Sequence, residues 1–321
     1  MKIPILLITH DRPNLLQKIL TRLLLYTNWD EFELWILDNN STSSNRKIIS
    51  AFKERYSFIN IFSSYYNQIA LIQNEIISKL KRDLYIKLDD DILVPPNWTN
   101  AFVNCFNRNY SRMSFGSVII PVNGFGWVPY LKIMNLENEF NKLFPKEPLV
   151  QDCIKTPVWN NPMIQEYLWK KSININKTTE VFLKKQNYQY KDLICNHRYS
   201  IGAIVFSHKF WEGMGGWKLD DLFYKRERLN SRLNKLYNII KWISGKDKNR
   251  LRKIFNEIAG VDLGFLGIEE QYAFDYSKSK DLIIPVTTEG IVYHFAFGTA
   301  EEYLMKKIFL DIDNSSLTDL K

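Results

Sequence analysis

The stretch that decides the fold is residues 84–91, Leu-Tyr-Ile-Lys-Leu-Asp-Asp-Asp, where a mainly apolar run ends in three carboxylates. A short run of this kind is typical of a strand buried on both faces. Alternate strand residues point the same way, so Asp89 and Asp91 are predicted to share a face, with Asp90 opposite. Adjacent carboxylates repel unless a cation or water relieves them, and two oxygen ligands suit Mg²⁺ or Mn²⁺. The alternative is a solvated acidic turn or a helix cap before Pro95.

Strand-like and helix-like patterns alternate on either side of this stretch. The predicted strands cover 3–8, 34–37, 58–62, 84–88 and 117–121. The predicted helices cover 13–26, 44–56, 67–80 and a segment opened by Pro95 and Pro96. This alternation predicts right-handed βαβ units and an α/β fold with a mainly parallel sheet. Ligands bind beyond the carboxyl ends of such strands, so residues 9–12, 38–41 and 89–91 form the candidate site.

The second part of the chain is less regular. Residues 123–200 are rich in aromatic residues and prolines, and regular signals return at 201–206 and 213–217. Residues 282–286 and 291–295 are predicted to form a final strand pair. A short helix and a polar tail are expected at the end of the chain.

The composition fits one large globular domain, or two halves that share a sheet. The chain has 321 residues, of which 45% are hydrophobic and 24% charged, enough for a substantial core. Three widely spaced cysteines favour reduced thiols in the cytoplasm over a disulfide framework. Cys195 and His197 could begin a metal site, but a buried thiol near a surface histidine is the simpler interpretation. No apolar run is long enough for a transmembrane helix, so we expect a cytoplasmic protein.

Positive charge is concentrated in one segment. The net charge is +8, and residues 225–253 hold 11 Lys or Arg against Glu227 and Asp247. Apolar residues at helical spacing predict a basic amphipathic helix there. The helix could pack on the domain, or it could lie on an anionic membrane surface and make the protein peripheral at the inner face of the membrane. No nucleic-acid-reading motif accompanies the charge, so we expect no nucleic-acid partner.

Two nucleotide-binding classes are disfavoured by the loops. No Gly-x-Gly-x-x-Gly follows the first strand, which argues against a dehydrogenase, and no Gly-x-x-x-x-Gly-Lys-Ser/Thr appears, which excludes P-loop NTPases. Asp38 ends the second strand. An acidic residue there contacts a ribose in dinucleotide folds, or it caps the helix near Ser43.

Six segments together carry a family resemblance. They are Ile3 to Asn14 (IPILLITHDRPN), Leu34 to Thr42 (LWILDNNST), Leu84 to Asp91 (LYIKLDDD), Phe210 to Trp217 (FWEGMGGW), Gly267 to Gln271 (GIEEQ) and Val292 to His294 (VYH). The first three resemble the nucleotide-sugar signatures of GT-A fold glycosyltransferases, especially inverting family 2-like enzymes. The others look like this family's acceptor-side Gly-Gly-aromatic loop, its base motif and its late histidine. Residues 123–200 and 222–260 have no assigned counterpart.

The resemblance implies a domain organisation. A Rossmann-like sheet of the GT-A type would be flanked by helices. Residues 1–122 would form the nucleotide-sugar-binding half, and 123–298 the acceptor-binding half with a basic helical insertion at 222–260. Residues 299–321 would form a C-terminal helix and tail.

The resemblance also implies roles for individual residues. The nucleotide would be contacted by Thr9, Asp11, Arg12, Asp38, Asn67, Asp89 and Asp90. The metal, Mn²⁺ or Mg²⁺, would be held by Asp89, Asp91 and His294. The acceptor would meet Gly216, Trp217 and Asp220, with the Trp217 ring stacking on a sugar. Glu270 aligns with the family's catalytic aspartate and would be the base.

Three departures from the family pattern leave alternatives open. Asn39 stands where a second acidic residue is usual. The base position is a glutamate, so Glu269 and Asp220 or Asp221 remain candidates, and the glutamate pair could also be a helix's first turn stabilised by its dipole. His294 could be a buried, hydrogen-bonded histidine instead of a ligand.

The predicted function is therefore a metal-dependent glycosyltransferase. It would move a sugar from a nucleotide-diphosphate sugar, most simply a UDP-sugar, to a hydroxyl of a glycan or lipid-linked acceptor, with inversion, in surface polysaccharide or glycoconjugate synthesis. One rival is a sugar nucleotidyltransferase, although residues 10–13 lack the glycines that would cradle a triphosphate. The other is a non-catalytic glycan-binding protein that retains the fold.

Overall fold

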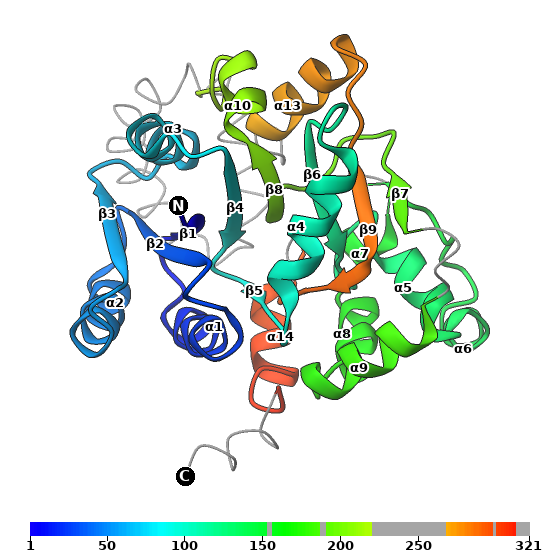
Figure 1. Ribbon diagram of the computed structural model, residues 1–321. Helices are drawn as coiled ribbons and strands as arrows, with labels where there is room; N and C mark the ends of the chain where they lie inside the picture. Colours follow the sequence, from blue (N-terminus) through cyan, green and yellow to red (C-terminus); the bar gives the residue numbers. More distant parts are fainter. Residues whose placement is uncertain (153–155, 187–190, 220–267, 298–299, 313–321) are drawn as a thin grey trace, which may run out of the picture.

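The computed structural model describes residues 1–152, 156–186, 191–219, 268–297 and 300–312. Their main feature is an eight-stranded sheet with the order β3-β2-β1-β4-β8-β6-β9-β7 (Figure 1). Its strands, in that order, are β3 (Asn60–Ser64), β2 (Phe32–Asn39), β1 (Ile3–Thr9), β4 (Leu84–Asp89), β8 (Ala203–Ser207), β6 (Phe115–Ile119), β9 (Pro285–Ile291) and β7 (Asp192–Ile194). The predicted α/β class with a mainly parallel, helix-flanked sheet is confirmed.

The first half of the sheet is built from parallel βαβ units, as predicted. Strand β1 pairs in parallel with β2 and β4, and β2 with β3. The connecting helices are α1 (Pro13–Tyr26), α2 (Ser43–Arg55) and α3 (Ile69–Leu80). Helices α1 and α2 lie on one side of β1 to β3, and α3 lies on the other (Figure 1). The carboxyl ends of β1, β2 and β4 therefore meet at one edge.

Helix α4 (Trp98–Asn109) begins later than predicted. The sequence predicts that Pro95 and Pro96 open it, but a residue that precedes a proline is pushed towards extended backbone. The chain enters the helix only after Asn97, which is left-handed with φ 59°. The segment before it forms the short strand β5 (Ile92–Leu93) instead.

The predicted final strand pair is wrong. Strand β9 runs parallel to β6, whereas β10 (Tyr293–His294) pairs antiparallel with β5 in a separate two-stranded ribbon. Only Val292 separates β9 from β10, which is too short for a hairpin loop, so the chain continues and changes partner. Because His294 pairs with Ile92, it is brought beside Asp91.

The irregular part of the sequence is largely helical. It contains α5 (Trp127–Met134), α6 (Glu137–Leu143), α7 (Pro157–Asn160), α8 (Pro162–Lys170) and α9 (Ile175–Lys185). Figure 1 shows these helices grouped at the β9–β7 end of the sheet. They are 4 to 11 residues long, too short for a clear helical period. Side chains of Thr156, Asn161 and Asn174 cap the last three of them.

Three further helices complete the described structure. They are α10 (His208–Gly213), α13 (Ile268–Ser279) and α14 (Glu301–Lys307). The predicted basic helix of 225–253, the insertion 222–260, Asp220, Asp221 and the polar tail 313–321 lie outside the described residues. Within the part of the chain that is described, no helix is long and apolar enough to cross a bilayer.

Candidate active site

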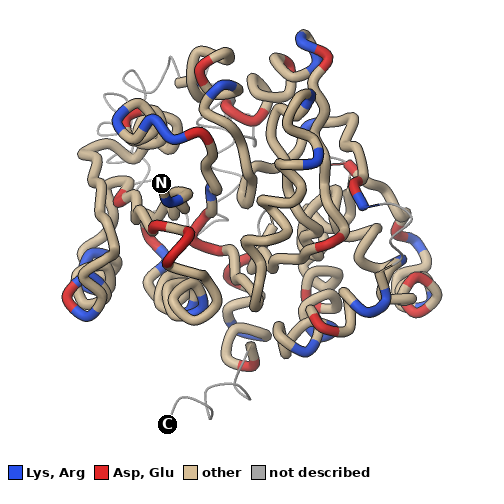
Figure 2. Tube along the Cα trace, viewed as in Figure 1, with Lys and Arg blue, Asp and Glu red and all other residues tan. Residues whose placement is uncertain are grey.

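Acidic side chains gather at the carboxyl edge of the sheet, where β4 leads towards β5. Figure 2 shows acidic segments converging there. Strand β4 ends at Asp89, so the alternation that predicted a shared face for Asp89 and Asp91 does not extend to Asp91. The three aspartates instead take three different sets of partners.

Asp90 faces the loop after β1. Its Oδ2 accepts hydrogen bonds from the Thr9 hydroxyl at 2.7 Å and the His10 backbone N–H at 3.2 Å. Its Oδ1 lies 3.0 Å from Nη1 of Arg12. Burial, only partly offset by Arg12, raises the pKa of Asp90 to about 6. The Thr9 hydroxyl also accepts from Asn45 at 2.8 Å. The Asp90 carboxylate and the Thr9 hydroxyl are therefore both engaged in hydrogen bonds that hold the loop after β1 against the end of β4.

Asp91 is paired with His294. Its Oδ2 lies 3.2 Å from His294 Nε2 and 2.8 Å from Arg12 Nη1. Its Oδ1 is buried and has no hydrogen-bond partner among the described residues. Burial pushes the pKa of Asp91 upward, but His294 and Arg12 outweigh it and hold the pKa at about 2. Burial opposes ionisation of His294 as well, but Asp91 outweighs it and raises the histidine pKa.

Asp89 points to a different cation. Its Oδ1 lies 2.6 Å from Nζ of Lys87, a residue that is only 2% exposed. Its Oδ2 faces Gly202, where an added Cβ would come within 3.3 Å. Burial is the largest influence on Asp89 and raises its pKa.

Arg12 spans the acidic group and the C-terminal helix. Besides Asp90 and Asp91, its Nη2 lies 3.0 Å from Glu301 of α14. Both edges of the guanidinium are therefore occupied by carboxylates. A permanent cation between three acids offsets their mutual repulsion.

Glu270 lies in the first turn of α13, at the same edge. Its side chain is 13% exposed, and its Oε1 accepts from the Ile201 backbone N–H at 3.1 Å. Its Oε2 is 4.0 Å from Arg198. Burial raises the pKa of Glu270 to about 7. Glu269 precedes it in the same turn and is partly buried.

The nucleotide candidates on β2 shape the neighbouring loop. Asp38 is 6% exposed, and its Oδ1 accepts from the Ser41 backbone N–H at 2.7 Å. Its Oδ2 lies 3.2 Å from Nε of Arg46. The N-cap of α2 is Thr42, so Asp38 stabilises the turn before the helix rather than the helix end itself. Asp11 is exposed and accepts from the Thr42 hydroxyl at 3.1 Å.

Asn39, which stands where the family pattern has an acid, uses both ends of its amide in hydrogen bonds. Its Nδ2 donates to Asn67 Oδ1 at 2.9 Å, and its Oδ1 accepts from the Gln68 backbone N–H at 2.9 Å. Asn67 Nδ2 in turn donates to His10 Nε2 at 3.0 Å. An aspartate at position 39 could not donate to Asn67.

The acceptor-side loop is anchored to α3 by a residue that the sequence did not single out. Oδ1 of Asn74 accepts from the Trp217 backbone N–H at 2.8 Å and from the Trp211 indole at 2.9 Å. Gly216 has φ +85°, and an added Cβ would lie 3.0 Å from that oxygen. The Trp217 ring is 1% exposed and packs edge-on against Phe206. Because the ring is buried, it has no exposed face on which an acceptor sugar could stack, contrary to the prediction.

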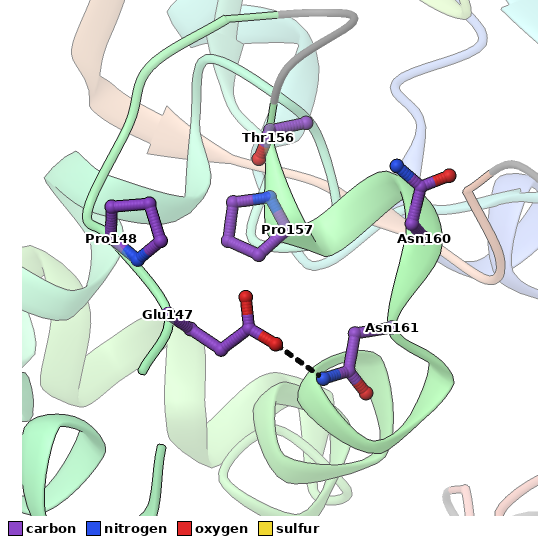
Figure 3. Close-up of a pocket in the computed structure, with 6 residues that line it drawn as sticks. All are labelled: Glu147, Pro148, Thr156, Pro157, Asn160 and Asn161. Carbon is purple, nitrogen blue, oxygen red and sulfur yellow. Dashed lines mark hydrogen bonds between the residues drawn. The ribbon is translucent and has the colours of Figure 1, made fainter. Parts of the chain in front are cut away.

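One cavity, of about 320 Å³, lies apart from the acidic group (Figure 3). Its lining residues are Glu147, Pro148, Thr156, Pro157, Asn160 and Asn161. Figure 3 shows the Asn161 amide donating to Glu147, at 3.0 Å. With one carboxylate and no histidine, this lining lacks the ligand set of a metal centre, and we place the cavity outside the candidate active site.

A divalent metal fits one part of the site. Among the described residues, no group of three or more His, Cys, Asp or Glu side chains is arranged to hold an ion. Asp91 and His294 nevertheless form a pair in which Asp91 Oδ1 has no partner. His294 Nδ1 donates to the Val122 carbonyl at 3.1 Å, so Nε2, which faces Asp91, is the nitrogen that would bind a metal after losing its proton. Two protein ligands would leave positions for phosphate oxygens.

The chain belongs to glycosyl transferase family 2, because that family's model matches residues 5–166, half of the sequence. No curated protein sequence matches it. The structure is similar to that of GalNAc-T7 with UDP, GalNAc and Mn²⁺, at 10% identity and a TM-score of 0.52, over 94% of this chain and 45% of that one. This likeness supports the GT-A glycosyltransferase fold.

Two other solved structures overlap over a smaller region. TarS of S. aureus, residues 1–349, is 13% identical over 37% of this chain and 36% of that one, with a TM-score of 0.32. The mannosyltransferase PcManGT from Pyrobaculum calidifontis, in complex with GDP-Man and Mn²⁺, is 13% identical over 37% and 35%, with a TM-score of 0.32. The chain spans less than half the length of each of these three proteins.

Proposed function

We propose that this glycosyltransferase is metal-dependent and inverting, and that it transfers a sugar from a UDP-sugar to a hydroxyl of a glycan or lipid-linked acceptor. Surface polysaccharide or glycoconjugate synthesis would use such a reaction. The observation that supports metal dependence most directly is the unpartnered, buried Oδ1 of Asp91 beside His294. A buried carboxylate oxygen without a partner is costly, and a bound cation would satisfy it.

In this proposal Asp91 and His294 hold Mn²⁺ or Mg²⁺. When bound, the metal would neutralise the charge that develops on the leaving diphosphate. Arg12 offsets part of the negative charge of the acidic group before donor binding, because it pairs with Asp90 and Asp91. Asp38, Asp11 and the loop held by Asn67 would meet the nucleoside.

Glu270 is the proposed base. A pKa of about 7 suits a group that must take a proton near neutral pH and is largely ionised just above it. The Ile201 N–H holds Oε1 of this carboxylate, and Oε2, which lies 4.0 Å from Arg198, is the oxygen that would take the proton. Removal of the proton from the acceptor hydroxyl by Glu270, with attack at the sugar C1 from the side opposite the diphosphate, inverts that carbon.

Donor binding and turnover test the two parts of the proposal separately. UDP binding is measured by calorimetry with and without Mn²⁺, and donor hydrolysis is followed with a panel of UDP- and GDP-hexoses. We expect Asp91→Asn to weaken Mn²⁺-dependent UDP binding by at least about tenfold. We expect Glu270→Gln to lower kcat by about 100-fold or more with UDP binding retained. Asp30→Asn, at an exposed position outside the site, is the control.

Each alternative gives a different result. UDP binding that Mn²⁺ does not change would contradict the metal site. Metal-dependent UDP binding without turnover of any donor favours a glycan-binding protein that retains the fold. Formation of a sugar nucleotide from UTP and a sugar phosphate would favour the nucleotidyltransferase.

A further inference from the structure

Lys87 is a cation in the interior of the sheet that the proposed reaction does not use. It lies on β4 and is 2% exposed. Lysine is almost never fully buried unless its ammonium group is paired. Here Nζ lies 2.6 Å from Asp89 Oδ1 and donates to the Ile201 carbonyl at 2.7 Å.

The strand register explains these two contacts. Lys87 and Asp89 are two residues apart on β4, so their side chains leave the strand on the same face. Lys87 also pairs with Ile204 of the antiparallel strand β8. Ile201 lies just before β8, within reach of the lysine side chain. The ammonium group therefore ties the end of β4 to the chain that enters β8.

The same short segment also holds Glu270. The Ile201 N–H donates to Glu270 Oε1 at 3.1 Å, and the Gly202 carbonyl accepts from the Asp89 N–H at 2.8 Å. Residues 201 and 202 thus lie between the end of the donor-side strand and the base. Lys87 is the side chain that fastens this segment to Asp89.

We propose that Lys87 is a positioning residue, which fixes the base Glu270 relative to the donor-binding carboxylates through its bonds to Asp89 and the Ile201 carbonyl. This inference rests on the proposed function, because Glu270 is the base in that reaction. A displacement of about 1 Å between reacting groups can cost about 100-fold in rate. The ammonium group would therefore act on the chemical step rather than on nucleotide affinity.

A purely structural role for Lys87 predicts a different outcome. Removal of a buried cation leaves Asp89 and a backbone carbonyl without a partner, so some loss of stability is expected in either case. A structural role would lower the amount of folded protein and leave kcat per folded molecule unchanged. The loss of stability caused by Lys87→Met would also be the same in the wild-type and in the Glu270→Gln protein.

The test measures kcat and KM for donor hydrolysis, and the Kd of UDP with Mn²⁺, at a temperature where every variant is folded. Lys87→Met is made in the wild-type and in the Glu270→Gln protein. Lys53→Met is the control, because Lys53 Nζ donates to two backbone carbonyls, at 2.6 and 2.5 Å, but lies outside the site and is only partly buried. If Lys87→Met does not fold, Lys87→Gln is measured instead, and a smaller loss of kcat is expected, because the glutamine amide can still donate but has no charge to pair with Asp89.

We expect Lys87→Met to lower kcat by about 100-fold, with the Kd of UDP changed less than about fivefold. In the Glu270→Gln background the same change should cost less than about threefold, because the base is already absent. Equal losses in both backgrounds, an unchanged kcat, or a loss confined to UDP binding would each overturn the positioning role. Failure of the proposed function is recognised separately, because Glu270→Gln alone would then turn over like the wild type.

Discussion

Replacement of the proposed base by its amide should make the protein more stable while it removes activity. Glu270 has a folded-state pKa of about 7 against an ordinary value of 4.5, and burial is the main cause. The folded state therefore holds this proton more tightly than the unfolded chain does. The stability that the protonated carboxyl provides is fully present below pH 4.5 and is lost as the pH rises through 7.

The size of the effect follows from the two pKa values. The difference between 4.5 and about 7 corresponds to about 3 kcal/mol of lost stability once the folded carboxylate is ionised. The glutamine side chain of the Glu270→Gln variant stays neutral at every pH and can still accept from the Ile201 N–H. We compare the free energy of unfolding of this variant with that of the wild type at each pH. The variant's advantage is expected to be about 2–3 kcal/mol larger at pH 8 than at pH 5. In a chain of this length that is about 5 °C in Tm.

Urea unfolding and thermal melts of both proteins, at intervals from pH 5 to pH 8, measure this difference. Glu137→Gln is the control, because Glu137 also lies in a helix first turn but is remote from the site. The reasoning is refuted if Glu270→Gln is no more stable than the wild type at pH 8. It is also refuted if the advantage is the same at pH 5, since a pH-independent gain would not come from the ionisation of Glu270.

Two further changes test the loops around the site. Asn39→Asp restores the usual acidic pattern but removes the donor to Asn67, so we expect the free energy of unfolding in urea to fall by about 1–3 kcal/mol. An unchanged urea midpoint would show that this hydrogen bond does not contribute to stability. Gly216→Ala should cost more than Gly215→Ala, because both glycines have positive φ but only at 216 would the new Cβ meet Asn74. Both should lose about 1–2 kcal/mol from the backbone, and equal melting temperatures for the two variants would contradict the proposed contact.

The βαβ half of the fold was open to prediction because its signals are local. The apolar runs of β1, β2 and β4 and the helical period of α1 lie within single elements. Alternating strands and helices allow few topologies, and those place the acidic stretch 89–91 at a carboxyl edge. The family resemblance could assign further residues to that edge, because each of its motifs lies within one continuous segment and can be recognised without the tertiary structure.

The partners of those residues were decided only by the tertiary structure. Whether Asp91 meets His294 depends on β10 leaving the main sheet to pair with β5. The bond between Asn74 and the Trp217 backbone, and that between Lys87 and the Ile201 carbonyl, each join residues that are far apart in the chain. A local pattern reports the period and the burial of its own segment. Contacts between distant segments depend instead on how the whole sheet is ordered and packed.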